Sequence, residues 1–281
     1  MIIDGHAHGF VAENTDEPFW WEKPPQNRIK DLLRDMDAHG VRMAALLQAH
    51  FCPNELSQKA VKDYPGRFIA FCGWGKDKTG REAAEEVETW LREPEFKGVG
   101  EAVLRRLQVK GKGESFRGLI REWKPVMDVV SAKNVPILFH TGYSGAHSGR
   151  GATPLKLKDP IYLDDLIVDY QGTPIIIGHS GGLYPPYDQN AILLAFNYTN
   201  VYLDLSKSRT DVIERVVREI GPSKLLFGSD WVSGEETTYG PKNERTTHLY
   251  DRNIKIVEEA RISDEDKEKI FYKNIQSLLK L

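Results

Sequence analysis

The sequence predicts an α/β protein that folds as a single (β/α)8 TIM-type barrel over residues 1–281. Three observations lead to this prediction: eight short apolar segments, amphipathic stretches with helical periodicity between them, and the absence of a linker, repeat or low-complexity tract. A chain of this length suffices for one such barrel. The alternative is an open, doubly wound parallel sheet, which the same alternation of strands and helices also allows.

Eight segments are predicted to be the strands of the sheet. They cover residues 1–4, 43–48, 68–72, 97–101, 135–140, 174–179, 200–205 and 224–230. Two of them are continuously apolar at their centres, at Ile137-Leu138-Phe139 and at Ile175-Ile176-Ile177. Such runs are typical of parallel strands that are covered on both faces.

Helices are predicted between these strands because apolar residues recur there on one helical face. Gly40 is expected to end the first helix, and Pro125 is expected to begin another that ends near Asn134. The apolar positions are Ile29, Leu32, Leu33 and Met36; Val126, Val129 and Val130; Val212, Val216, Val217 and Ile220; and several within 270–281, which we expect to form the closing helix.

Composition excludes several classes of protein. With 28% charged residues and a formal net charge of -3, the chain offers no basic surface for nucleic acid, and no apolar run is long enough to cross a membrane. Cys52 and Cys72 have no zinc-like spacing, and because Met1 leads directly into Ile2 and Ile3, we expect no signal peptide. We therefore expect a cytoplasmic protein that acts on a small molecule.

Histidine and aspartate residues stand where predicted strands end. His6 and His8 follow the first strand with i, i+2 spacing, so both imidazoles point to the same side. His140, His179 and Asp230 end the fifth, sixth and eighth strands. Because closure of a barrel places the eighth strand beside the first, these side chains should meet at the C-terminal rim. Imidazole and carboxylate groups are suitable ligands for zinc, manganese or iron(II).

Several segments around these residues are motif-like. They are Ile3-Asp4-Gly5-His6-Ala7-His8, Phe139-His140-Thr141-Gly142, Gly178-His179-Ser180-Gly181-Gly182, Phe227-Gly228-Ser229-Asp230-Trp231 and the C-terminal Asn274-Ile275-Gln276-Ser277-Leu278-Leu279. Together they resemble the amidohydrolase superfamily, and more narrowly the amidohydrolase-2 group that includes aminocarboxymuconate-semialdehyde decarboxylase. The resemblance covers the whole chain and is more informative about family than about substrate.

The resemblance implies a ligand set and a catalytic pair. His6, His8, His140 and Asp230 match the ligands of a single divalent ion, for which zinc is the first choice and manganese or iron(II) are alternatives. His179 matches a histidine that acts as a general base or orients the water molecule at the metal.

Glu101 ends the fourth strand, where two-metal relatives carry a carbamylated lysine. Related deoxyribonuclease-like proteins place a metal-bridging glutamate in a context similar to Gly100-Glu101. The resemblance therefore leaves open for Glu101 a second ion or a contact with substrate. An ion pair with Arg105 or Arg106 is the structural alternative.

Candidates for substrate binding lie in the segments that follow the strands. Three of these segments are long, at residues 9–26, 142–159 and 232–249, and would project from the same rim as the site. Lys207 and Arg209 would bind a substrate carboxylate, with ordinary surface charge as the alternative. Aromatic side chains would form walls for a planar substrate, or would pack the loops: Trp20, Trp21, Trp74, Tyr143 and Trp231.

Sequence and resemblance together predict a metal-dependent hydrolase that acts on a lactone, an amide or a related small carbonyl compound. Asp230 would take the proton of the attacking water, and His179 would orient that water or stabilise the oxyanion. The main alternative is a metal-dependent, non-oxidative decarboxylase of an aromatic or dienoic acid. A metal-independent lactonase and a non-catalytic metal-binding barrel are further alternatives, and the resemblance leaves a homodimer open.

Overall fold

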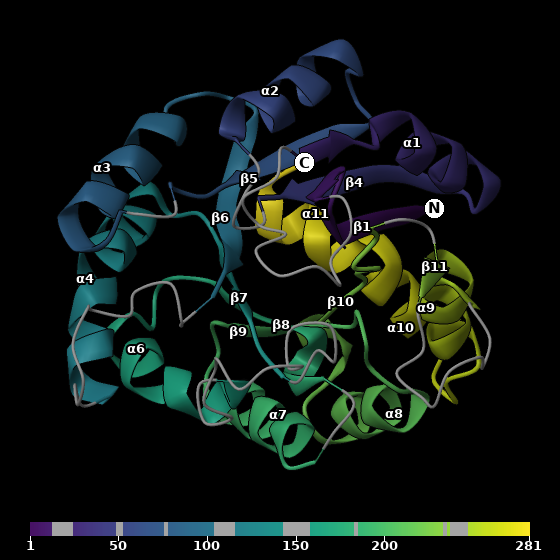
Figure 1. Cartoon of the computed structure of the whole chain (residues 1–281). Coiled ribbons are helices and arrows are strands. Elements are labelled where there is room, and N and C mark those ends of the chain that lie inside the picture. The colour runs from purple at the N-terminus through teal and green to yellow at the C-terminus, as the bar shows by residue number, and fades with distance from the viewer. Residues whose placement is uncertain are drawn as a thin grey trace.

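A computed structural model describes residues 1–12, 25–48, 53–75, 78–103, 116–142, 158–182, 185–232, 235–236 and 247–281. Eight parallel strands form a barrel, and helices surround it (Figure 1). The predicted (β/α)8 architecture is confirmed, and the strand order excludes the open, doubly wound sheet because neighbours in the barrel follow one another along the chain.

The barrel strands agree with the eight segments predicted from the sequence, with ends that differ by a few residues. Each is parallel to the next. They are β1 (Ile2–Ala7), β4 (Val41–Leu47), β5 (Phe68–Cys72), β6 (Phe96–Ala102), β7 (Ile137–His140), β8 (Ile175–Gly178), β9 (Val201–Asp204) and β10 (Leu225–Leu226). Short antiparallel pairs form outside the barrel from β2 (Phe10–Ala12) with β3 (Pro25–Asn27), and from β11 (Glu235–Glu236) with β12 (Thr247–His248).

The barrel closes between β1 and the segment that follows β10. Asp230 N–H donates to His6 O at 2.8 Å. His8 N–H donates to Trp231 O at 2.7 Å, and Ala7 pairs with Trp231 in a parallel bridge. These backbone contacts place both histidines of the first strand directly beside Asp230.

Helices cover the outside of the barrel. Those predicted from apolar periodicity around Met36 and Val216 are confirmed as α1 and α8. Among the described residues, no helix combines the length and apolar character that spanning a membrane requires. The helices are α1 (Ile29–Ala38), α2 (Asn54–Asp63), α3 (Gly80–Trp90), α4 (Phe116–Lys133), α6 (Asp164–Asp169), α7 (Tyr187–Asn197), α8 (Thr210–Glu219), α9 (Leu249–Glu258), α10 (Asp264–Glu268) and α11 (Asn274–Leu279), and a π-helical turn (Lys269–Lys273) joins the last two.

Pro125 does not begin a helix, so this prediction was wrong: the residue lies inside α4. A proline there removes one backbone hydrogen bond, which normally disfavours a helix. The fully buried side chains of Trp123, Val126 and Met127 flank it, and their packing outweighs this local cost. The end of the helix is as expected, because Asn134 adopts a left-handed φ of 50° directly after it.

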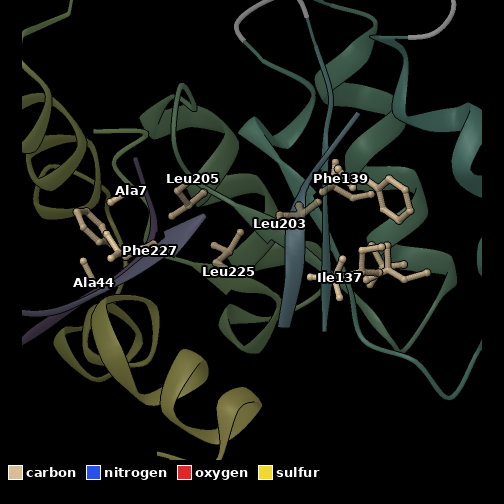
Figure 2. Packing of buried hydrophobic residues seen from close by; sticks show 14 of the residues in the cluster. Ala7, Ala44, Ile137, Phe139, Leu203, Leu205, Leu225 and Phe227 are labelled. Atoms are coloured by element: carbon tan, nitrogen blue, oxygen red, sulfur yellow. The ribbon is translucent and has the colours of Figure 1, made fainter. Parts of the chain in front are cut away.

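Alternate residues of the strands fill two separate layers of the core. Leu138 of β7 belongs to an inner cluster inside the barrel, together with Ile275 and Leu279 of α11. Its neighbours Ile137 and Phe139 belong to the outer cluster between the strands and the helices (Figure 2). Because both faces of the strands are buried, their apolar runs are continuous, as the sequence suggested.

Candidate metal centre

Six side chains that the sequence places at strand ends meet in one cluster at the C-terminal ends of the barrel strands. None of them is more than 18% exposed, so charges among them are poorly screened by water. They are His6 of β1, His8 directly after it, Glu101 of β6, His140 of β7, His179 after β8 and Asp230 after β10.

Three of these residues form a compact trio. His6 Nε2 lies 3.2 Å from His8 Nε2, and Asp230 Oδ1 lies 3.5 Å from the first and 3.3 Å from the second. For ligands bound at about 2.0–2.1 Å in a tetrahedron, neighbouring donor atoms are about 3.3 Å apart. The spacings of the trio therefore suit three ligands of one small divalent ion.

Glu101 connects this trio to the two remaining histidines. Its Oε2 lies 3.6 Å from His8 Nε2, while its Oε1 lies 2.5 Å from His140 Nδ1 and 3.1 Å from His179 Nε2. His140 Nδ1 and His179 Nε2 are themselves 3.1 Å apart. His140 is thus turned towards Glu101 and His179, and the Arg105 and Arg106 partners considered for Glu101 lie outside the described residues.

Hydrogen bonds on the outer side of the rings orient the histidines of β1. His6 Nδ1 lies 2.8 Å from Asp204 Oδ2, and His8 Nδ1 lies 3.2 Å from the carbonyl oxygen of Leu47. Both partners are acceptors, so each Nδ1 carries the proton that it donates. The Nε2 lone pairs of both rings consequently face the centre of the cluster, which is the tautomer that a metal ligand requires.

His179 is oriented in the same way, through a hydroxyl group. Ser206 Oγ donates its proton to Asp204 Oδ2 and therefore accepts from His179 Nδ1 at 2.9 Å. Asp204 Oδ2 also accepts the backbone N–H of His179 at 2.9 Å. Burial and the nearby Lys207 ammonium lower the pKa of His179 to about 4, so its inward Nε2 carries no proton at neutral pH.

The centre of the cluster favours a cation. Burial alone would lower the pKa of His6, but the carboxylates of Asp204, Glu101 and Asp230 raise it to about 10. The carboxylates of Glu101 and Asp230 would repel one another without a positive charge between them, which a proton on His6 or a bound metal ion supplies. This donor set of imidazole nitrogens and carboxylate oxygens fits zinc, manganese or iron(II).

Three residues around the centre adopt a left-handed backbone, which is uncommon outside glycine. The φ angles are 60° for His179, 58° for Lys207 and 55° for Asp230, each shortly after a barrel strand. Conformations of this kind cost free energy and cluster at functional sites. Lys207 Nζ forms an ion pair with Asp230 Oδ2, so this candidate for substrate binding lies at the edge of the centre.

A second network joins β1 to the loop that carries Asp230. The buried Asp4 carboxylate accepts the backbone N–H of His6 and of Ser229, both at 3.0 Å, the Ser229 hydroxyl at 2.5 Å and the Tyr250 hydroxyl at 2.9 Å. Because Asp4 and His6 are on the same strand, these bonds hold the histidine pair against Asp230.

Sequence reasoning missed the roles of Asp4, Asp204 and Ser206. The signal for Asp204 was present, because it is a charged residue at the end of a predicted buried strand, as His140 and His179 are. The role of Ser206 depends on contacts between β8 and β9 that no local pattern indicates.

Arg209 is not turned to the centre. Its guanidinium donates to Asp188 Oδ2 at 2.9 Å and to Asp211 Oδ1 at 3.0 Å. These two carboxylates hold it at the start of α8, whereas Lys207, two residues earlier, reaches Asp230.

The aromatic candidates that the structure describes are packed in the core. Trp231 is fully buried and its Nε1–H donates to Asp35 Oδ2 at 3.1 Å. Trp74 is 3% exposed and lies edge-on to Trp123, with ring centroids 5.4 Å apart. Both indoles are therefore part of the hydrophobic core and do not line a substrate pocket. Trp20, Trp21 and Tyr143 lie outside the described residues.

Comparison with known proteins supports the architecture. A family model described as amidohydrolase matches residues 3–281. One similar solved structure is 4-oxalomesaconate hydratase from Rhodopseudomonas palustris, with a TM-score of 0.69 and 18% identity over 100% of this chain and 96% of that chain. No curated protein matches the chain.

Two further structures illustrate the range of reactions among the neighbours. A probable 2-pyrone-4,6-dicarboxylic acid hydrolase from Acinetobacter baumannii has a TM-score of 0.67 and 18% identity, over 100% of this chain and 99% of that chain. A dihydroxybenzoic acid decarboxylase from Polaromonas sp. JS666, with bound manganese, has a TM-score of 0.65 and 22% identity, over 99% of this chain and 97% of that chain. At such identities the likeness concerns the fold alone.

Proposed function

Because the chain belongs to the amidohydrolase family, we propose that it is a metal-dependent hydrolase that attacks a small carbonyl compound with water. The observation that carries the proposal is the trio of His6 Nε2, His8 Nε2 and Asp230 Oδ1, whose spacings suit one divalent ion. When bound, such an ion polarises a carbonyl group and makes a water molecule more acidic. We expect zinc, with manganese, which the Polaromonas neighbour binds, and iron(II) as alternatives.

The protein's own residues hold and orient this ion. His6 and His8 present Nε2 lone pairs because Asp204 and Leu47 take the protons of their Nδ1 atoms. Glu101 lies within 3.6 Å of His8 and adds a carboxylate on the side of His140 and His179. His140 is the fourth ligand in the set that the sequence suggested, and it would reach the ion on the Glu101 side.

Asp230 is the proposed proton acceptor. Burial opposes its ionisation, but the neighbouring Lys207 ammonium holds its pKa well below the usual range, so it is a carboxylate at neutral pH. In this form it takes the proton of the attacking water and returns it to the leaving group. His179, whose ring Ser206 orients, would position that water or stabilise the developing oxyanion.

Non-oxidative decarboxylation is the second candidate. One observation favours it: the Lys207 ammonium beside Asp230 is a suitable partner for the carboxylate of an acid substrate. Two of the structural neighbours are 2,6-dihydroxybenzoate decarboxylase and dihydroxybenzoic acid decarboxylase. In this reaction Asp230 or His179, neither of which holds a proton at the centre at neutral pH, would first take one from a water molecule and then deliver it to the carbon atom that loses CO2.

Metal content provides the first test. Protein purified without added metal should hold about one equivalent of zinc or manganese per chain, since one complete trio is present. His6→Ala should lose this ion because a trio ligand is removed, whereas Glu101→Ala should keep it. Wild-type protein that holds no metal, and takes none up on titration, would sink the proposal and favour the metal-independent lactonase.

Products distinguish the two reactions. The metal-loaded protein should be assayed against lactones, amides and carboxylated aromatic compounds in water enriched in the heavy oxygen isotope. Heavy oxygen in a newly formed carboxylate, without release of CO2, is the expected result for hydrolysis. Release of CO2 with a proton from solvent in its place would replace the hydrolase proposal by the decarboxylase. Lys255→Met, which removes an exposed lysine paired with Glu259, is the control for both assays.

A further inference from the structure

Lys207 places a positive charge at the edge of the candidate metal centre. Its Nζ pairs with Asp230 Oδ2, whereas Asp230 Oδ1 is the oxygen nearest to His6 and His8. The lysine side chain is 19% exposed and the aspartate 11% exposed. Because water screens this pair poorly, the ammonium acts on any ion bound nearby.

The backbone holds Lys207 in this position. Ser208 N–H donates to the carbonyl oxygen of Leu205 at 2.9 Å and closes a turn around the lysine. The guanidinium of Arg252 donates to the carbonyl oxygen of Ser208 at 3.1 Å and fixes the far end of the turn. Within it, Lys207 has a φ of 58°, a conformation that is retained only where surrounding contacts enforce it.

The donor atoms of the centre form two groups. The first is the trio of His6, His8 and Asp230, whose spacings suit a bound ion. The second consists of Glu101, His140 and His179, whose nearest donor atoms are 2.5–3.1 Å apart. The shortest of these contacts is the hydrogen bond between His140 Nδ1 and Glu101 Oε1, so an ion in the second group would have to replace that proton. Lys207 lies at the first group, since its Nζ pairs with Asp230 Oδ2. The second group adjoins the first, because Glu101 lies 3.8 Å from His6 Nε2 and 3.6 Å from His8 Nε2. The positions share the Glu101 carboxylate, which lies between them.

The charges around these positions balance for one ion. With neutral imidazoles, the carboxylates of Glu101, Asp204 and Asp230 carry three negative charges, and Lys207 carries one positive charge. One divalent ion neutralises the remainder, while a second ion would leave an excess of two positive charges in a buried cluster. Such an excess is unfavourable where the dielectric constant is low. Without Lys207, one ion would leave a negative charge uncompensated.

We propose that Lys207 limits the centre to a single divalent ion, because its ammonium supplies charge that a second ion at Glu101, His140 and His179 would otherwise supply. The proposal rests on the proposed function, since it assumes an ion held by His6, His8 and Asp230. Lys207 is a positioning residue in this scheme: it determines the metal stoichiometry and holds Asp230 with Oδ1 towards the ion.

Manganese binding to the full chain tests the proposal. Mn²⁺ alone is titrated into wild-type protein, Lys207→Met, Lys207→Arg and the surface control Lys255→Met. Equilibrium dialysis gives the stoichiometry, and electron paramagnetic resonance detects coupled ions. Lys207→Met keeps the aliphatic stem and removes the charge, and its affinity for a second ion should rise at least about tenfold, given the strength of charge interactions at low dielectric. Lys207→Arg and the control Lys255→Met should bind one ion, as the wild type does.

A second variant guards against indirect effects. In Lys207→Met/His179→Ala the additional ion and the coupled resonance signal should both disappear, because this variant removes a ligand of the second position that is not among the proposed ligands of the first. If wild type and Lys207→Met each bind one Mn²⁺ ion with equal affinity, the inference is overturned and the proposed function stands. Two ions in wild type would also overturn it. No ion in wild type would overturn both.

Discussion

Nδ1 of His6 lies 2.8 Å from Oδ2 of Asp204, on the side of the imidazole ring that faces away from the candidate metal centre. The same carboxylate oxygen accepts the backbone N–H of His179 at 2.9 Å and the hydroxyl of Ser206. One residue at the end of β9 therefore sets the orientation of histidines that come from β1 and β8.

Asp204→Asn should weaken metal binding about 10–100-fold, the usual effect of losing a partner that orients a metal-bound histidine. The amide keeps the size of the side chain but loses its charge, and its NH2 group cannot accept the bonds that Oδ2 accepts. Calorimetric titration with zinc measures the change. Asp211→Asn, which alters an exposed aspartate paired with Arg209, should bind as the wild type does. Equal affinity in Asp204→Asn would show that His6 needs no such partner.

Gly228→Ala should disturb the contact between His6 and Asp204 by displacing the aspartate carboxylate. A Cβ at this position would lie 2.0 Å from Asp204 Oδ1 and 3.0 Å from His6 Cβ, so the carboxylate has to move. We expect a loss of about 1–3 kcal/mol in stability, as for overpacking of a core, together with weaker metal binding. Denaturant unfolding and metal titration report the two effects.

Gly172→Ala is the matched control for this change. A Cβ there meets nothing within 4 Å, and the residue precedes β8, whereas His179 follows the other end of that strand. Its stability and metal affinity should equal those of the wild type. Normal metal binding by Gly228→Ala would contradict the prediction. It would show that Asp204 can move without loss of affinity, and that its carboxylate does not need a glycine at position 228.

Metal affinity should rise with pH in the neutral range. The carboxylates of Asp204, Glu101 and Asp230 outweigh burial and raise the pKa of His6 to about 10, so metal-free protein holds a proton that the ion must displace. Apparent affinity should therefore increase up to about tenfold per pH unit between pH 7 and 9. Titration in buffers of different ionisation enthalpy should detect the released proton. Affinity that is independent of pH in this range would contradict a protonated His6.

The same shift makes a prediction about stability without metal. His6 has a higher pKa in the folded state than the 6.5 of the unfolded chain, so the folded state binds more protons between these values. Its contribution to the free energy of unfolding is complete below about pH 6.5 and is lost as the pH rises towards 10. Thermal unfolding of chelator-treated protein between pH 7 and 9 should show this decline, and His6→Asn should reduce it.

The Asp4 network should stabilise the closure of the barrel cooperatively. Tyr250→Phe removes a buried hydrogen bond of 2.9 Å and should cost about 1–3 kcal/mol. Asp4→Asn should cost more because it leaves several donors without an anionic acceptor. The coupling energy in the double mutant is expected at about 0.5–3 kcal/mol. Tyr272→Phe, which loses an exposed bond to Glu268, is the control and should change stability little. Strict additivity of the Asp4 and Tyr250 changes would contradict a shared network.

Local patterns were sufficient to predict the barrel. Alternation of apolar strands such as 135–140 with amphipathic helices such as the one around Met36 depends on periodicity, which is written in neighbouring residues. Pro125 is the exception, since its tolerance inside α4 depends on packing by Trp123 and Met127 against other elements. The order of the strands and the closure of the barrel were then sufficient to predict that His6, His8 and Asp230 are neighbours.

The sequence by itself determined which donor residues stand at the strand ends, because a barrel converts position along the chain into position on one rim. Only the tertiary structure decided how they are grouped: Glu101 lies against His140 and His179, and Lys207, rather than Arg209, reaches the centre. Only the tertiary structure also shows that Asp204 and Ser206 accept hydrogen bonds from Nδ1 of His6 and His179 and so fix the tautomers of these rings. Such choices depend on side-chain directions and charges of residues that are distant in sequence and meet only across neighbouring strands, where no local pattern carries the information.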